Sequence, residues 1–203
     1  IRILFGRVQG SPKSNSKQGK KFAVISVLPS LTNSEIISFI ELGANKIGYE
    51  GFFSGQIPKA SLGLDQSELK KISGFINLLL EVYHTLGANY SESLQTTIKP
   101  LVFSLVSAQN RIESTSLVDS IITEKMAKNI RLNGMRCLTE LFKIIGDGFD
   151  WNDYLSLIYD NLLNPRMDTF ADENLQQPSA MLKLISFWIG QSNTLPFLYI
   201  DEF

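Results

Sequence analysis

The stretch DQSELKKISGFINLLLEVYHTLG, residues 65–87, decides the fold class because it contains a complete helix signal. Asp65 can cap the first free amides, and Glu68 follows three residues later, as in a capping box. Gly87 provides a natural C-terminal stop. Between these ends, apolar residues recur at the spacing of one helix face: Leu69, Ile72, Ile76, Leu79, Leu80, Tyr83 and Leu86. The stretch therefore predicts a long amphipathic helix that must bury one side.

Similar signals lie on both sides of this helix. Upstream, Thr32 and Glu35 repeat the capping pattern, and the helix that they start is expected to stop near Gly43. Downstream, a helix is predicted from about residue 92 to residue 111. Pro100 is expected to kink it, because proline lacks the amide that an interior position donates.

The second half of the chain continues the pattern. A long helix is predicted over about 117–145, with Asn133-Gly134 as the place where a break would fall. Its expected apolar face consists of Leu132, Met135, Leu138, Leu141, Phe142 and Ile145. Asp150 is expected to cap a further helix that ends at Asn164-Pro165, and Pro178 to open another.

Helix follows helix with no convincing strand alternation, so the predicted class is all-α. Amphipathic pairs that recur every 40 or so residues match the spacing of HEAT-type repeats, which stack into a solenoid. We therefore expect a HEAT-like α-solenoid of antiparallel helix pairs, with an irregular bundle as the alternative. The prediction treats residues 1–203 as one repeat segment, interrupted by a basic loop at about 9–19 and a Gly-rich loop at about 43–64.

Both ends of the sequence interrupt a pattern. Ile1 already stands inside an apolar helical spacing, and the final FLYIDEF carries no terminal signal. We therefore expect an interior fragment of a much longer chain. With 44% hydrophobic residues, no long apolar run and one cysteine, an intracellular protein is the default expectation.

The charge is strongly polarised along the chain. Residues 1–21 carry six basic side chains and no acid, whereas the rest carries 13 basic and 20 acidic residues, or about −7. Ser, Gly and Asn separate the lysines, so the segment could reach phosphates as a flexible loop, or could be a solvated loop without a partner. The candidate contact residues for RNA or an acidic partner are Arg2, Arg7, Lys13, Lys17, Lys20 and Lys21.

Residues for catalysis are scarce. His84 is the only histidine and is interpreted as lying at the edge of a helix interface. Cys137 stands in an apolar run and is interpreted as a buried structural thiol rather than a nucleophile. No catalytic residue is predicted, and the protein is not expected to be an enzyme.

Metal and cofactor motifs are also missing. Asp147, Asp150 and Asp153 fall at every third position, whereas a calcium loop needs alternate positions. The glycines at 43 and 48 have the spacing of a phosphate loop, but Tyr49 stands where lysine is required. We predict no metal, no cofactor and no small-molecule substrate.

Four segments are more specific than the helical pattern. RILFGRV (2–8), KKFAVISVLPSLTNSEIISFIEL (20–42), IRLNGMRCLTELF (130–142) and PSAMLKLISFW (178–188) occur in one order. Together they resemble the very large HEAT-repeat component twenty of the small-subunit processome, the family of the down-regulated-in-metastasis protein. The similarity extends over most of the chain, and none of these segments is a catalytic motif.

The resemblance implies a nucleolar α-solenoid that acts without enzymatic activity. It implies a scaffold that organises pre-ribosomal RNA, snoRNP and processome assembly proteins during maturation of small-subunit rRNA. The alternative is a HEAT-type protein–protein adaptor with no direct RNA contact, which the acidic remainder of the chain favours. Neither reading predicts a membrane partner.

Overall fold

The computed structural model describes residues 23, 25–49, 64–113, 121–145, 154, 159–167, 176 and 182, and within these ranges it contains helices and no strand. The predicted all-α class is confirmed. The elements in chain order are η1 (Leu28–Ser30), α3 (Asn33–Lys46), α4 (Gln66–Leu86), η2 (Gly87–Tyr90), α5 (Ser91–Gln95), α6 (Ile98–Glu113), α7 (Ile121–Ile145), η3 (Tyr159–Leu163) and η4 (Asn164–Arg166).

Helix α4 has the predicted start and stop. The amide of Glu68 donates to Asp65 Oδ1 at 2.8 Å, and the amide of Asp65 donates to Glu68 Oε2 at 2.8 Å. At the other end Gly87 adopts a φ of 60°, a left-handed value that glycine reaches without strain. Local sequence therefore sets both ends of this helix.

Helix α3 begins as predicted but ends later. Thr32 and Glu35 form the capping box, and the amide and hydroxyl of Thr32 lower the pKa of the Glu35 carboxyl by donating to it. The expected stop near Gly43 is wrong, because Gly43 is buried inside the helix, which continues to Lys46. The glycine that follows the helix end is Gly48, with a φ of 81°.

The single kinked helix predicted over 92–111 is also wrong. The chain forms two helices, α5 and α6, with a turn at Thr96 and Thr97 between them. Both threonine hydroxyls donate to carbonyls three residues earlier, Ser93 O and Leu94 O, at 2.6 Å. Pro100 lies in the first turn of α6, where a missing amide costs no helical hydrogen bond.

Helix α7 is continuous from Ile121 to Ile145, so the possible break at Asn133-Gly134 does not occur. Gly134 serves a different purpose, which is close helix packing. A Cβ atom at this position would lie 2.7 Å from Leu105 Cδ2 of α6 and 3.4 Å from Ile76 Cδ1 of α4. The missing side chain lets α7 approach both neighbours at one level.

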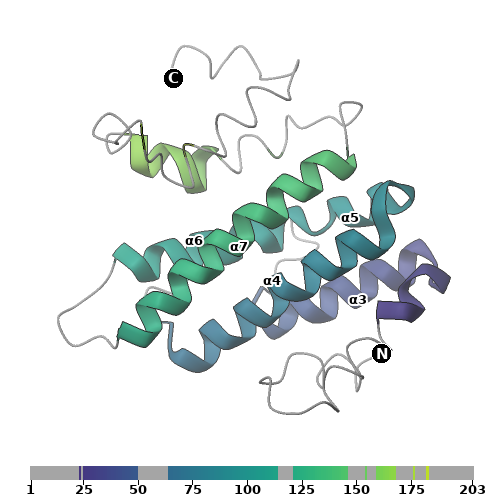
Figure 1. Cartoon of the computed structure of the whole chain (residues 1–203), viewed down its shortest axis with the longest axis horizontal. Coiled ribbons are helices and arrows are strands. Elements are labelled where there is room, and N and C mark those ends of the chain that lie inside the picture. The colour runs from purple at the N-terminus through teal and green to yellow at the C-terminus, as the bar shows by residue number, and fades with distance from the viewer. Residues whose placement is uncertain are drawn as a thin grey trace.

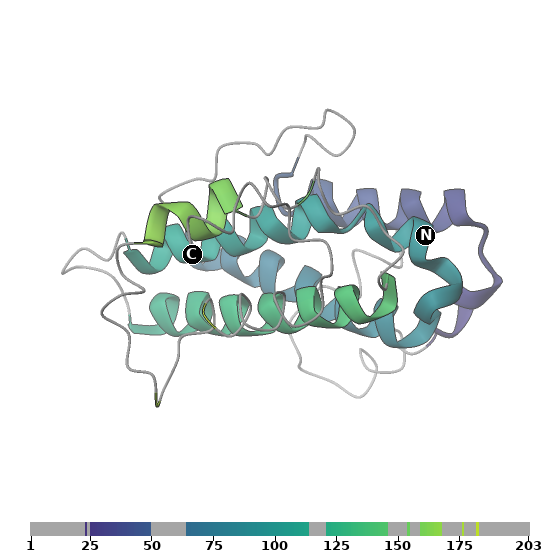
Figure 2. The same cartoon turned by 90° about the horizontal axis from the view of Figure 1, so that it is seen from above.

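The four longest helices form two antiparallel pairs. Figures 1 and 2 show α3 running against α4 and α6 running against α7, so that α4 and α7 are parallel. Helix α7 packs against both α6 and α4. Two neighbouring pairs agree with stacked repeats, but the extended solenoid remains a prediction.

Helix α6 is the most enclosed element. Its buried residues occupy nearly every side of the helix, from Ile98 and Leu101 to Ala108 and Arg111. A helix that is buried on nearly every side occupies a central place in the packing. The buried Arg111 donates through Nε to the carbonyl of Leu64 and through Nη2 to Thr123 Oγ1, both at 3.2 Å, which joins the start of α4 to the start of α7.

A buried hydrogen bond links α4 to the turn before α6. The Tyr83 hydroxyl lies 2.6 Å from Thr97 Oγ1, and because Thr97 donates its proton to Leu94 O, Tyr83 is the donor. Burial raises the pKa of Tyr83 well above its ordinary value, so the phenol stays neutral. This bond fixes the end of α4 relative to the following pair.

Several expectations fall outside the described residues. These include the apolar start of the chain, the helix start at Asp150 and the helix opened by Pro178. The structure does describe the region of the predicted helix end at Asn164-Pro165. There η3 (Tyr159–Leu163) buries Leu162, and η4 begins at Asn164.

Replacing Gly134 with alanine should destabilise the chain, although alanine is the better helix former by about 1 kcal/mol. The new methyl group would press on the fully buried Leu105, and overpacking of this kind typically costs about 1–3 kcal/mol. Urea unfolding followed by circular dichroism measures the change. The matched control is Asn129→Ala, an exposed position of the same helix, which should be neutral or stabilising. Equal gains at both positions would contradict the packing role of Gly134.

Candidate functional site

The six basic residues predicted to contact RNA or an acidic partner all lie outside the described residues. The contact role of Arg2, Arg7, Lys13, Lys17, Lys20 and Lys21 therefore stays a prediction. Among the residues that the structure does describe, helix α7 carries more cations than any other helix.

Helix α7 is the most basic of the described helices. It carries five basic residues and two acidic ones, whereas α4 carries two of each. Among its exposed residues, one line repeats at steps of three or four: Ile121, Lys125, Lys128, Leu132 and Arg136. Residues at this spacing share one side of a helix. We call these five residues the outer stripe of α7.

The outer stripe points away from the packed side of the helix. Ala127, Ile130, Gly134, Leu138 and Leu141 are buried and occupy the opposite side. Gly134 faces Leu105 of α6 and Ile76 of α4, so this side of α7 is turned toward the core. The outer stripe is therefore held outward by the packing of the core.

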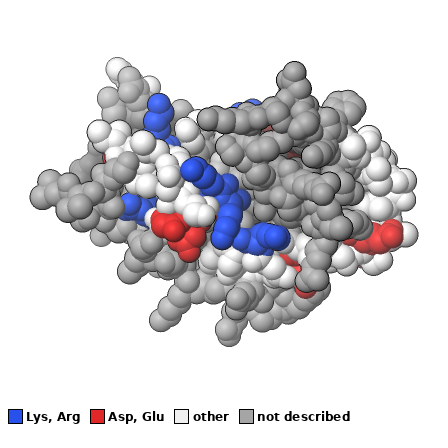
Figure 3. Space-filling model, turned by 90° about the horizontal axis from the view of Figure 1, so that it is seen from below, with Lys and Arg blue, Asp and Glu red and all other residues white. Residues whose placement is uncertain are grey.

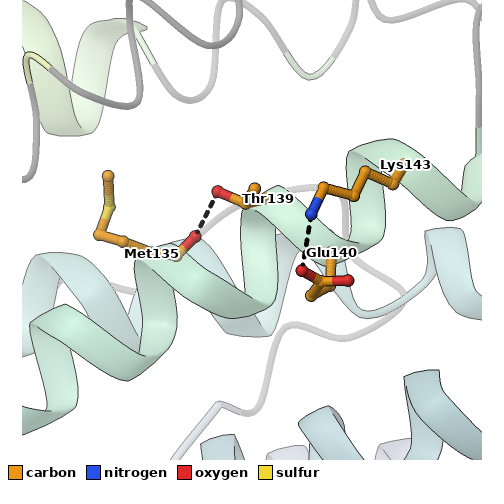
Figure 4. Close-up of polar contacts among 4 residues, drawn as sticks. All are labelled: Met135, Thr139, Glu140 and Lys143. Atoms are coloured by element: carbon orange, nitrogen blue, oxygen red, sulfur yellow. Dashed lines mark hydrogen bonds and ion pairs between the residues drawn. The ribbon is translucent and has the colours of Figure 1, made fainter.

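Glutamates of α7 neutralise part of its charge. Lys128 forms an ion pair with Glu124 one turn earlier, and Lys143 pairs with Glu140 at 2.9 Å. Figure 4 shows the second pair beside the Thr139 hydroxyl, which donates to the carbonyl of Met135. Exposed pairs of this type contribute little stability, about 0.3–0.5 kcal/mol each.

Two cations of the outer stripe take no part in these pairs. Lys125 and Arg136 form no ion pair within the part of the chain that the structure describes. They are 11 positions apart, or about 16 Å along a helix that rises 1.5 Å per residue. Figure 3 shows Lys and Arg side chains gathered on the underside of the molecule, next to a smaller acidic group.

Large apolar side chains are exposed on the same helix as these cations. Ile121 is 83% exposed and Leu132 is 55% exposed, and the neighbouring Ile122 is 57% exposed. The prediction that Leu132 belongs to the buried face is wrong. The side of α7 that packs on α6 and α4 contains Gly134, and Leu132 lies on the opposite, solvent-exposed side. Three of the four large hydrophobic residues exposed in the described chain are on α7.

The catalytic candidates offer no reactive arrangement. His84 is exposed on α4. Cys137 is fully buried, and its thiol donates to the carbonyl of Ile76 at 3.4 Å, so the interpretation as a structural thiol is confirmed. Burial raises the pKa of this thiol well above its usual range, which suppresses the reactive thiolate.

The described ranges also lack a metal-binding cluster and a membrane-spanning helix. No group of three or more His, Cys, Asp or Glu residues there could hold a metal ion. No described helix combines the length and apolar character needed to cross a bilayer. The Asp147, Asp150 and Asp153 series lies outside these ranges.

Sequence reasoning missed the outer stripe of α7, although its signal is present. Ile121, Lys125, Lys128, Leu132 and Arg136 already show helical spacing in the sequence. The net acidic charge of residues 22–203 conceals this local basic helix, and the apolar members suggest a buried face. The missing information was the direction in which α7 packs.

Comparison with known proteins gives a consistent result. The family model described as "U3 small nucleolar RNA-associated protein 20, N-terminal" matches residues 1–203. A protein named U3 small nucleolar RNA-associated protein 20 from Saccharomyces cerevisiae is 34% identical over 203 residues. The protein of that name from Schizosaccharomyces pombe is 21% identical over 195 residues, or 93% of the chain. The chain spans about 8% of the length of each relative.

Cys137 should resist thiol reagents in the native chain, because the thiolate is disfavoured and the sulfur is buried. At pH 8 we expect labelling by a chromogenic disulfide to be at least about 100-fold slower than in denaturant, since reaction requires opening of the structure. Cys137→Ala identifies any background signal. Rapid labelling under native conditions would contradict the buried assignment.

Proposed function

Because the chain belongs to the U3 small nucleolar RNA-associated protein 20 family, we propose that it is a scaffold segment of a small-subunit processome protein. In this role it organises pre-ribosomal RNA, snoRNP and assembly proteins in the nucleolus during maturation of small-subunit rRNA. The observation that carries the proposal is the family match over all 203 residues. The scaffold role and its partners go beyond that match.

The helical architecture supports a scaffold. Two antiparallel pairs lie side by side, with α4 of one pair parallel to α7 of the next (Figure 1). Repeats of this kind stack only on their neighbours and build long surfaces, so a segment of 203 residues can form part of a much longer HEAT-like solenoid. An extended surface suits the organisation of several partners at once.

A non-enzymatic role is part of the proposal. Within the described ranges, the two residues considered for catalysis are separated by their environments, since His84 is exposed and Cys137 is buried with a raised pKa. A histidine base and a nucleophile need to lie within hydrogen-bond reach of each other. Scaffolding needs neither.

The six basic residues of the N-terminal segment are the proposed RNA contacts. Basic side chains gain affinity for RNA by releasing counterions from phosphates, whatever the base sequence. The remainder of the chain is acidic, with 13 basic against 20 acidic residues, and would contribute repulsion over much of its surface. RNA contact is therefore proposed to be local.

The second candidate function is a protein–protein adaptor without direct RNA contact. The observation that favours it is the exposure of Ile121, Ile122 and Leu132 on α7, because protein partners bury apolar surface. A scaffold can also contact proteins. The two candidates therefore differ in whether the basic N-terminal segment touches RNA.

Reversing the charge of Arg2, Arg7, Lys13, Lys17, Lys20 and Lys21 in the full-length protein should weaken binding to small-subunit pre-rRNA. Each lost phosphate contact should lower the slope of log affinity against log salt by about 0.7–0.9. Filter binding at several salt concentrations measures both quantities. The control exchanges Lys for Arg and Arg for Lys at the same positions, which keeps the charge and should keep the slope. Unchanged affinity and slope in the charge-reversed protein would favour the adaptor.

A further inference from the structure

The outer stripe of α7 combines charge and apolar surface in a way that the RNA scaffold role does not require. RNA backbone contacts use cations and hydrogen-bond donors, and single strands add aromatic stacking. The stripe begins with Ile121, has Leu132 between its cations, and contains no aromatic residue. Exposed aliphatic side chains gain nothing from phosphates, so the stripe fits a protein partner better than RNA.

The charge of the stripe indicates the chemistry of that partner. Lys128 is already paired with Glu124. Lys125, which precedes the exposed Leu132 along α7, and Arg136, which follows it, are therefore the cations available to a partner. A complementary segment would place carboxylates near these two cations, about 16 Å apart, and an apolar side chain between them. An amphipathic helix of three turns has this reach.

We propose that the outer stripe of α7 docks an acidic amphipathic helix of a partner protein. Leu132 and Ile121 bury against the apolar side of that helix, and Lys125 and Arg136 pair with its carboxylates. The buried contacts of Gly134 hold the stripe rigid before binding, so little ordering cost falls on this side of the interface. This site shares no residue with the proposed RNA contacts at residues 1–21.

A photo-crosslinking amino acid at Leu132 of the full-length protein tests the docking site in purified pre-ribosomal particles. We expect crosslinks to a protein segment rich in Asp and Glu, identified by mass spectrometry. The same probe at the exposed His84 of α4 is the position control and should not give that crosslink. Crosslinks from Leu132 to RNA, to another part of the same chain, or to nothing would overturn the proposal.

Variants of the stripe separate a protein contact from an electrostatic RNA contact. With the probe at Ile121, both Leu132→Gln and the double change Lys125→Glu with Arg136→Glu should reduce the crosslink at least about fivefold, since apolar burial and charge each contribute. The double change Lys46→Glu with Lys71→Glu, at exposed cations of α3 and α4, is the charge-matched control and should leave the crosslink intact.

The effects of charge reversal and of Leu132→Gln on the crosslink distinguish a protein contact from an electrostatic one. Loss on charge reversal with no effect of Leu132→Gln would overturn the protein partner in favour of an electrostatic contact. Recovery of small-subunit pre-rRNA with each variant is measured in parallel and reports on the proposed function. Normal recovery without the crosslink would refute the docking site alone, whereas absent pre-rRNA with the unmodified protein would refute the scaffold role.

Discussion

The approach of α7 to α6 and α4 at Gly134 is the constraint on which the arrangement of the two helix pairs depends. At this point the three helices come so close that a Cβ atom would lie 2.7 Å from Leu105. The Cys137 thiol, three residues on, donates to the carbonyl of Ile76 and reinforces the same junction. Helices that meet at a glycine gain many van der Waals contacts along their length, and these are lost together if the backbones separate. The junction therefore sets the distance between one pair and the next.

The same junction determines which side of α7 reaches the surface. Because Gly134 and Cys137 face inward, Lys125, Leu132 and Arg136 must face outward. A side chain that is 55% exposed, as Leu132 is, loses apolar burial that a different rotation of α7 would recover. The burial of Ala127, Ile130, Leu138 and Leu141 on the opposite side outweighs that loss. Rigid presentation of a mixed apolar and basic surface suits a protein that holds other molecules in place.

Local signals predicted part of this structure, and contacts distant in sequence decided the rest. Asp65, Glu68 and Gly87 are sufficient to place the ends of α4, because caps act within one turn. The predictions of a kink at Pro100 and a break at Gly134 failed for one reason. Each residue disfavours a helix interior in isolation, but Pro100 lies in the first turn of α6, and Gly134 lies where α7 packs tightly against its neighbours. The periodicity of α7 predicts a core position for Leu132, which is wrong because periodicity defines the apolar side of a helix only approximately. Of the sites, the buried Cys137 was predictable, whereas the outer stripe needed the packing direction of α7.

The junction at Gly134 joins the two helix pairs, and its integrity decides whether they behave as one unit. Native-state hydrogen exchange of the chain tests it most directly, through the amides around Gly134 in α7 and around Ile76 in α4. If the junction joins the pairs into one cooperative unit, both sets of amides will exchange with the same opening free energy. Exchange of the α7 amides through a separate, lower-energy opening, with α4 still protected, would contradict the account.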